Sequence, residues 1–447
     1  MNLLPPAARD DQSVWLRVGT LLDGTAAAPL RDAHVVYDRK AIRFVGANGR
    51  TPPPAALRAG QNQPDLDAPD ATLLPGLHEA HAHLFLEGGE LDLVKRAACL
   101  KQTPDELFVR AGDRLAKLVG LGITAVRDAG DKDGVGLALS RLGKGLPCAG
   151  VADPRSGPGS AGPAETGRPL MPYYESPGAA IFHRGRYGSF MAGALEDYPS
   201  PRACVTARVG AGADRIKLIP TGIINFKVGA VTTEPQMTVA EIAEIAAAAK
   251  FYGRQTFAHA SGDTGIDRVI EGGVDSVEHG YFVRDDQLAR MRDRQTAWVP
   301  TFAPVQAQVD HAGLMGWDTA VVENLRKILD QHAASLVKAH ELGVIIVAGS
   351  DAGSCGVPHG LGLLRELELM ESAGLPSLAV IHAATGAGSA RFAYRENFGR
   401  IAPGCISRFI LTRHSPLETV ANLRQPRTIV FDGEVLAAGA GVDTLGL

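Results

Sequence analysis

Residues 73–83 read Leu-Leu-Pro-Gly-Leu-His-Glu-Ala-His-Ala-His, an apolar run that ends in the pair His81-x-His83. Side chains two positions apart on a strand lie on the same face, whereas on a helix they diverge. Pro75 and Gly76 lie inside the run and argue against a helix. The stretch is therefore predicted to be a strand with two imidazoles on one face. Such a pair can hold a divalent metal ion, and a surface strand with two unrelated histidines is the alternative.

Short apolar runs alternate with helical stretches from residue 71 to about residue 398. Between two such runs, residues 238–252 are predicted to form a helix, because Thr238 and Glu241 form a capping box and Gly253 ends it. Strands that alternate with helices pair in parallel, and eight such units indicate an α/β fold with a closed (β/α)8 TIM barrel. An open doubly wound sheet is the alternative, although no Gly-x-Gly-x-x-Gly motif follows the first strand. The eight predicted strands cover residues 71–83, 122–130, 147–153, 213–221, 254–260, 275–280, 296–302 and 344–351.

Both ends of the chain carry shorter β-like patterns. Residues 13–46 and roughly 402–437 alternate in this way, and Asp432-Gly433 is a hairpin signal. Neither end has enough strands for a stable sheet of its own, so both ends are predicted to meet in one small β-sandwich. The predicted domains are the sandwich, formed by residues 1–73 and 399–447, and the barrel, formed by residues 74–398.

A long insert, residues 154–200, follows the third predicted strand and is rich in glycine, proline and aromatic residues. Loops of this length in a compact barrel are usually functional or disordered. The insert is predicted to be a lid over the barrel mouth, with disorder as the alternative. Within it, Arg155 and Tyr187 are predicted to contact the substrate.

The composition indicates which binding partners and which cellular compartment to expect. The net charge is −4, from 45 basic and 49 acidic residues, and it indicates no nucleic-acid or membrane surface. No apolar stretch approaches the roughly 18 residues of a membrane span, and no signal peptide is evident after Met1. The five cysteines are odd in number and scattered, which suits a reducing compartment. We therefore expect a cytoplasmic protein that binds a small-molecule substrate, and a homo-oligomer is left open.

Residue types that bind metals gather at the ends of the predicted strands. In a barrel these ends share the face on which active sites are built. Singly, each has an ordinary alternative role, since a histidine can be a core residue, a lysine can snorkel and an aspartate can cap a turn. Their coincidence at five strands predicts a site. The six residues are His81 and His83 at the first strand, Lys217 in the fourth, His259 at the fifth, His279 at the sixth and Asp351 at the eighth.

The chemistry of this set indicates metal ions. Imidazole and carboxylate suit zinc, manganese, iron or cobalt, and the absence of thiolates argues against a purely structural zinc site. A protonated Lys217, with an ordinary pKa of about 10.4, would repel the metals. Carboxylation of its amine by CO2 would instead give a bridging carbamate that two metals stabilise. Such a pair lies roughly 3.5–4 Å apart, activates a shared water and polarises a carbonyl.

Taken in order along the chain, these motifs resemble the amidohydrolase superfamily. The likeness is to its imidazolonepropionase-like branch, which includes metal-dependent Xaa-Pro and Xaa-Arg dipeptidases, and it covers nearly the whole chain. The matching segments are Pro75-Gly76-Leu77, His81-x-His83, Lys217, His259-Ala260, Glu278-His279-Gly280, Gly349-Ser350-Asp351-Ala352-Gly353, Pro358-His359-Gly360, Ala383-Ala384-Thr385, Gly399-Arg400-Ile401 and Pro403-Gly404.

The resemblance implies a binuclear centre, with zinc as the expected metal. It implies that Asp351 takes the proton of the metal-bridging hydroxide during attack and passes it to the leaving group. His359, on the loop beyond Asp351, is predicted to contact the substrate together with Arg155 and Tyr187. The implied ligands are His81, His83 and Asp351 on one metal, His259 and His279 on the other, and carboxylated Lys217 as the bridge.

The implied activity is hydrolysis of a C–N bond in a small amide, carbamate, urea or N-acyl amino acid. Glu79 stands where the family usually has Asp, which is a conservative change. A Gly-Gly-His motif of the dipeptidases is replaced by residues 155–159, and Ser261 stands in place of their tyrosine, so a dipeptidase is an alternative. Lactone or phosphoester hydrolysis on the same centre is another. A non-catalytic metal-binding scaffold is disfavoured, because it would have no need of both Lys217 and Asp351.

Overall fold

The computed structural model describes residues 3–9, 12–49, 52–58, 60–146 and 170–436. The chain divides into two compact units. We call the first the end unit, which comprises Met1–His78, Lys117–Ala125 and Pro376–Leu447. The second is the barrel unit, Glu79–Ala116 and Val126–Leu375. Among the described residues, no helix has the length and apolar character needed to cross a membrane.

One seven-stranded sheet of the end unit joins the two ends of the chain, as the sequence predicts. Strand β4 pairs in parallel with β1 from the N-terminal part and antiparallel with β16 from the C-terminal part, with Leu73 opposite Leu411. Asp432 and Gly433 form the predicted hairpin turn, and both have positive φ angles. The strand order is β18 (Glu434–Leu436), β17 (Arg427–Phe431), β16 (Arg408–Thr412), β4 (Leu66–Pro75), β1 (Val14–Leu21), β2 (Leu30–Tyr37) and β3 (Ile42–Gly46).

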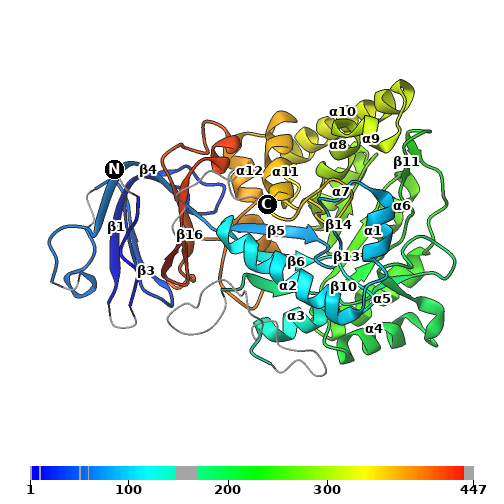
Figure 1. Ribbon diagram of the computed structural model, residues 1–447, viewed down its shortest axis with the longest axis horizontal. Helices are drawn as coiled ribbons and strands as arrows, with labels where there is room; N and C mark the ends of the chain where they lie inside the picture. Colours follow the sequence, from blue (N-terminus) through cyan, green and yellow to red (C-terminus); the bar gives the residue numbers. More distant parts are fainter. Residues whose placement is uncertain (1–2, 10–11, 50–51, 59, 147–169, 437–447) are drawn as a thin grey trace. The chain divides into compact units, whose positions relative to one another are not determined.

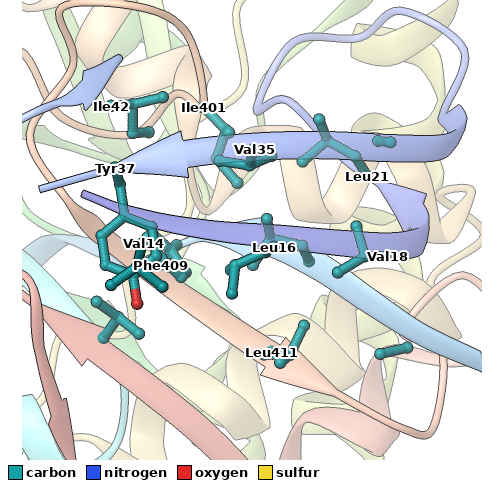
Figure 2. Close-up of a cluster of buried hydrophobic side chains, with 14 of the residues drawn as sticks. Val14, Leu16, Val18, Leu21, Val35, Tyr37, Ile42, Ile401, Phe409 and Leu411 are labelled. Carbon is teal, nitrogen blue, oxygen red and sulfur yellow. The ribbon is translucent and has the colours of Figure 1, made fainter. Parts of the chain in front are cut away.

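This sheet curls back on itself around an apolar core. In sheet order β2 and β16 are separated by β1 and β4, which would place them roughly 14 Å apart if the sheet were flat. Instead, the rings of Tyr37 on β2 and Phe409 on β16 meet edge to face with centroids 4.9 Å apart. Figure 2 shows these rings with Leu16, Val35 and Leu411 in the same buried cluster. The curled sheet therefore gives the two facing layers that the predicted sandwich requires.

The strands of the predicted barrel form two sheets. In the longer sheet, β8, β10, β13, β14 and β15 pair in parallel. Figure 1 shows helices arranged around the strands in this part of the chain. The sheet orders are β5 (Leu77–Ala82), β6 (Ile123–Asp128), β7 (Tyr173–Glu175), and then β15 (Ala297–Val299), β14 (Ser276–His279), β13 (Thr256–Ala260), β10 (Ile216–Leu218), β8 (Ala180–Phe182) and β9 (Ala192–Ala194).

The two sheets close into a barrel at both seams. On one side, residues 176–179 connect β7 directly to β8. On the other, residues 344–352 lie between β15 and β5, because Ile346 bridges Trp298 and Ala352 bridges Ala82. The eighth predicted strand is thus present as isolated bridges. The fold is the predicted TIM barrel with a smaller β domain built from both chain ends.

The helices follow the strands, as expected for a barrel. Helix α5 begins after Thr238, whose capping box with Glu241 is formed, and Gly253 follows its end with a φ of 65°. The helices are α1 (Leu93–Cys99), α2 (Pro104–Gly120), α3 (Val135–Gly143), α4 (Pro201–Gly210), α5 (Val239–Phe251), α6 (Asp263–Gly272), α7 (Asp285–Asp293), α8 (Ala303–Asp310), α9 (Ala312–Met315), α10 (Thr319–Leu342), α11 (Leu361–Ser372), α12 (Ser377–Ala383) and α13 (Gly386–Arg391).

One predicted region differs from the structure. The predicted third strand, residues 147–153, lies outside the described residues, as does the first part of the predicted lid. The strand beside β6 is β7, which lies within the range assigned to the lid. Tyr173 and Tyr174 of β7 are buried, at 5% and 3% exposed, so they belong to the barrel wall. The lid prediction is therefore wrong for β7 and β8, which are barrel strands.

Candidate metal centre

All six residues that the sequence nominates as metal ligands line one cavity of the barrel unit. The cavity has a volume of about 240 Å³. The residues come from the carboxyl ends of β5, β10, β13 and β14 and from residues 344–352 at the eighth strand position. All are at most partly exposed, because the barrel wall surrounds them. They are His81, His83, Lys217, His259, His279 and Asp351.

Three of these side chains form a compact group. The Nε2 atoms of His81 and His83 lie 3.6 and 3.5 Å from the same Asp351 oxygen, Oδ1. The ligand atoms of the three residues all lie within 4.8 Å of one another. This geometry suits one metal ion held by two imidazoles and a carboxylate.

The other two histidines lie beside this group. The ring centroids of His259 and His279 are 4.5 Å apart, and those of His279 and His81 are 5.0 Å apart. The four imidazoles are therefore close enough to serve a single centre. Burial lowers the pKa of His83 and of His259 to about 3, so both rings are neutral, as ligands must be.

Acceptors behind the rings fix which nitrogen carries the proton. The Nδ1–H of His81 donates to Glu278 Oε2 at 2.6 Å, and the Nδ1–H of His83 donates to the Gly130 carbonyl at 3.1 Å. The Nε2–H of His259 donates to the Gly222 carbonyl at 3.3 Å. The opposite nitrogen of each ring therefore keeps its lone pair, and Nε2 of His81 is buried without a hydrogen bond. A ring nitrogen that keeps its lone pair in this way can bind a metal ion.

Lys217 is the least expected member of the group. Its ammonium nitrogen is buried without a hydrogen-bond partner and lies 4.7 Å from the centroid of the Phe257 ring. Burial, opposed in part by Glu278 and Asp351, lowers the pKa of Lys217 to about 8. An amine near its neutral form can react with CO2, whereas an ammonium ion cannot.

A hydrogen bond orients the Asp351 carboxylate toward the histidines. Its Oδ2 accepts a hydrogen bond of 2.9 Å from Ser354 Oγ, and Oδ1 faces the histidines. Burial raises the pKa of Asp351 to about 7. A carboxyl group with such a pKa can both accept and release a proton near neutral pH.

Several residues that support the ligands were not assigned a role from the sequence. Glu278 accepts from Arg127 Nη2 at 2.9 Å and from Ser276 Oγ at 2.6 Å, in addition to His81. Thr301 Oγ1 lies 2.8 Å from Nδ1 of His279. The sequence signal for Glu278 was its place beside His279, but strand alternation predicts opposite faces for adjacent residues and so concealed its role.

Glu79 also supports the centre. Its Oε1 accepts from the backbone N–H groups of His81 and Ser350, at 3.1 and 2.9 Å, and its Oε2 accepts from Ser350 Oγ at 2.5 Å. One carboxylate thus ties β5 to the segment that carries Asp351. The extra methylene of Glu relative to Asp is accommodated in a fully buried position.

The predicted substrate contacts fall in three different places. Tyr187 lines the cavity, with its ring centroid 5.5 Å from that of His259. His359 is absent from the described lining, and its Nε2–H donates instead to the His83 carbonyl at 3.0 Å. The His359 ring therefore contacts the backbone of a candidate ligand residue, and its contact with a substrate stays a prediction. Arg155 lies outside the described residues.

Known proteins share both sequence and fold with this chain. Ochratoxinase from Aspergillus niger is 24% identical over 456 residues, which cover 98% of this chain and 90% of that protein. Imidazolonepropionase from a Polaromonas species is 31% identical over 172 residues, 33% of this chain and 38% of that protein. The crystal structure of a Xaa-Pro dipeptidase with bound methionine matches with a TM-score of 0.74 and 24% identity, over 95% of this chain and 100% of that one. That likeness shows a shared fold.

A model of the amidohydrolase family matches residues 72–436. The match runs from the last residues of β4 to β18, and so includes every ligand position described above. The chain therefore belongs to the amidohydrolase family and is a hydrolase that acts on carbon–nitrogen bonds.

Proposed function

We propose that the chain is a binuclear metal-dependent hydrolase that cleaves the C–N bond of a small amide, carbamate, urea or N-acyl amino acid. One observation carries the proposal. Ring nitrogens whose protons are fixed by outer acceptors, a buried amine without a partner and a carboxylate line the same cavity. A donor set of this kind, without thiolates, suits catalytic divalent metals.

Each ligand has a stated place in the proposal. His81, His83 and Asp351 would hold one metal ion, and His259 and His279 would hold the other. Carboxylation of the Lys217 amine by CO2 would turn a repelling cation into an anionic ligand for both. When bound, the metal pair, with zinc expected, would polarise the carbonyl and activate water for attack.

The remaining steps belong to the side chains themselves. Glu278 holds the His81 ring in the tautomer that leaves Nε2 unprotonated, and the Gly130 carbonyl does the same for His83. Asp351 accepts a proton from the attacking water and returns it to the leaving nitrogen, which would otherwise depart as a poor leaving group. The barrel wall leaves these side chains at most partly exposed, and electrostatic interactions are stronger where less water surrounds the charges.

Metal analysis and isotope labelling test the centre. The metal-replete protein should contain about two divalent ions per chain, since a binuclear site requires two. With 13C-labelled bicarbonate, a carbamate resonance should be present in the wild-type protein and absent in Lys217→Ala. A metal content near zero after purification with metal would overturn the proposal.

Turnover tests the role of Asp351. Asp351→Asn should lower kcat at least 100-fold, the smaller end of the range for loss of a positioned acid or base, with an unchanged circular dichroism spectrum. Asp310→Asn, on the exposed end of α8, is the matched control.

A panel of amides, carbamates, ureas and N-acyl amino acids supplies the substrates. Dipeptides, lactones and phosphoesters are assayed beside them, and exclusive cleavage of one of these three would favour the corresponding rival activity.

A further inference from the structure

Beyond the ligands, the cavity is lined mainly by apolar side chains from three separate elements. Phe190 and Met191 follow Tyr187 on the loop before β9, and Val305 comes from the first turn of α8. Ile224 and Phe226 come from the hairpin of β11 (Ile224–Asn225) and β12 (Ala230–Val231). Ile224 and Val305 also belong to a packed cluster with Tyr281 and residues of α10. The apolar wall is therefore built into the fold before any ligand arrives.

Within the described part of the lining, no side-chain cation is left free to pair with a substrate anion. Among the described residues that line the cavity, Lys217 is the single ammonium- or guanidinium-bearing side chain, and the proposed metal bridge uses it. A substrate carboxylate that leaves water needs a paired charge or several hydrogen bonds, and burying it without them costs several kcal/mol. Uncharged polar side chains of the lining include Ser261, Ser354 and Gln308.

Gln308 presents a hydrogen-bond donor to the cavity. Its Oε1 accepts from the indole Nε1–H of Trp317 at 3.0 Å. An indole nitrogen can only donate, so this bond fixes which end of the amide is the oxygen. The amide nitrogen of Gln308 has no partner within the described part of the chain, so it remains the free end.

Trp317 joins this donor to the apolar wall. Its ring meets that of Phe226 edge to face, with centroids 6.1 Å apart. The indole therefore holds Gln308 through a hydrogen bond and Phe226 through ring packing. A donor held in a fixed place beside an apolar surface is the arrangement by which ligand sites set orientation.

We propose that the cavity takes an uncharged substrate with a bulky apolar group beside the scissile C–N bond and a second carbonyl oxygen that accepts a hydrogen bond from Gln308. The inference rests on the proposed function, because it names the substrate class for the same site. It favours neutral acyl amides and carbamates over N-acyl amino acids and dipeptides with a free carboxylate.

A pair of ligands that differ in charge alone tests the first part. Benzoyl-L-alanine is an anion, and benzoyl-L-alaninamide has the same skeleton without the charge. Binding is measured by calorimetry to metal-loaded Asp351→Asn, whose turnover should be at least 100-fold slower than that of the wild type, and kcat/KM is measured on the wild-type enzyme. The neutral amide should bind at least tenfold more tightly, and equal or tighter binding of the carboxylate would overturn the inference.

A variant of Gln308 tests the second part. Gln308→Leu should weaken binding of benzoyl-L-alaninamide about 3- to 10-fold, as expected for one hydrogen bond, and should leave benzanilide, which lacks the second carbonyl, unchanged. Gln306→Leu is the matched control, because Gln306 lies on the same helix and bonds Asp310 instead of lining the cavity. Equal losses for both ligands, or no loss for either, would remove Gln308 from recognition.

The two proposals can fail separately. If wild-type enzyme loaded with metal cleaves none of the C–N compounds, the proposed function fails, while the calorimetric preference still decides the chemistry of the cavity. If the enzyme cleaves the carboxylates in preference to neutral amides, the function stands and the substrate inference is overturned.

Discussion

Residues at the centre occupy backbone conformations that side chains other than glycine rarely adopt. His279, Thr301 and Asp351 have φ angles of 68°, 52° and 55°, each just past the end of a barrel strand or at its last residue. On β14 the inner face already holds Glu278, so regular alternation would place His279 outside the barrel. The left-handed backbone conformation of His279 turns its own ring inward, so that His279 and Glu278 both lie inside the barrel. Each such residue costs about 1–3 kcal/mol, which the surrounding hydrogen bonds must offset.

Replacing Glu278 should weaken metal binding without removing a ligand. In Glu278→Gln, an amide group must face either His81 or Arg127, which both donate to the carboxylate. If it faces His81, the ring must accept at Nδ1 and its proton moves to Nε2, which removes the lone pair meant for the metal. We expect a 10- to 100-fold lower metal affinity, measured by competition with a chromophoric chelator.

The control for this change keeps the carboxylate and removes one of its donors. Ser276→Ala deletes the hydroxyl that bonds Glu278 Oε1 and leaves the His81 contact in place. Its metal affinity should stay within about threefold of wild type, since the ring tautomer does not depend on Ser276. Equal metal affinities in Glu278→Gln and wild type would show that the carboxylate does not set the tautomer.

The six ligand candidates could be predicted because each stands at a strand end, where sequence position alone gives the face of the barrel. The residues that hydrogen-bond these candidate ligands could not be predicted. Glu278 and Arg127 act through contacts between strands that are far apart in sequence, and Thr301 takes a left-handed backbone conformation that no local pattern predicts. For His359, a place on the loop after Asp351 in sequence was not enough to put the ring in the cavity lining.

At the scale of elements, the β11–β12 hairpin forms one wall of the cavity and is held from behind by α10. The Nδ2 group of Asn324 donates to the carbonyls of Phe226 and Lys227, at 3.4 and 3.0 Å. The hairpin itself has a two-residue ladder, Ile224 to Val231 and Asn225 to Ala230. So short a ladder is weak alone, and the wall depends on the anchor from α10.

Removing the hydrogen bonds from Asn324 should increase the mobility of the β11–β12 hairpin more than it lowers the free energy of unfolding of the protein. We expect Asn324→Ala to speed amide hydrogen exchange in residues 224–231 and to raise KM about 3- to 10-fold, with a smaller effect on kcat, because the wall binds substrate and does not react. The free energy of unfolding should fall by about 1 kcal/mol. Glu323→Ala, at the exposed neighbouring position, is the control. Unchanged exchange in the hairpin would contradict the anchor role.

Elements differed in how well the sequence predicted them. Helix α5 was predicted to within a residue, because its cap and its terminating glycine are local signals that Thr238, Glu241 and Gly253 carry. Strand β7 was missed, because it is three residues long and its two tyrosines do not show the alternation of a strand. Its place beside β6 is set by barrel closure, which no local pattern records.

At the scale of the molecule, the prediction that both chain ends combine in one small β domain succeeded for a physical reason. Neither end carries enough strands to cover an apolar face, so the ends must combine. The pairing of β4 with β16 meets that need, and Phe409 and Leu411 of β16 complete the core begun by Leu16 and Val35. What the sequence did not reveal is that the two layers are one curled sheet.

Stability as a function of pH should report on His332, which lies in the barrel unit and is not one of the candidate metal ligands. Its side chain is buried at 1% exposure, stacks on Tyr281 at 4.0 Å between ring centroids and donates from Nε2 to the Pro300 carbonyl at 3.0 Å. Its Nδ1 has no partner. Protonation would add an N–H with no acceptor, and burial accordingly lowers the pKa of His332 to about 3.

The sign of the effect follows from the pKa values of the two states. Between about pH 6.5, the ordinary histidine value, and about pH 3, the unfolded chain holds a proton on His332 that the folded chain does not. The contribution of His332 is therefore complete above pH 6.5 and is lost as the pH falls toward 3, by up to about 1.4 kcal/mol per pH unit.

Urea unfolding of the metal-free protein between about pH 7 and 4 measures the slope of the free energy of unfolding against pH. His332→Gln keeps a donor for Pro300, removes the titrating ring and should reduce the slope by about one proton. His340→Gln, at an exposed position of the same helix, serves as the control, and equal slopes in all three proteins would show that His332 is not the group responsible.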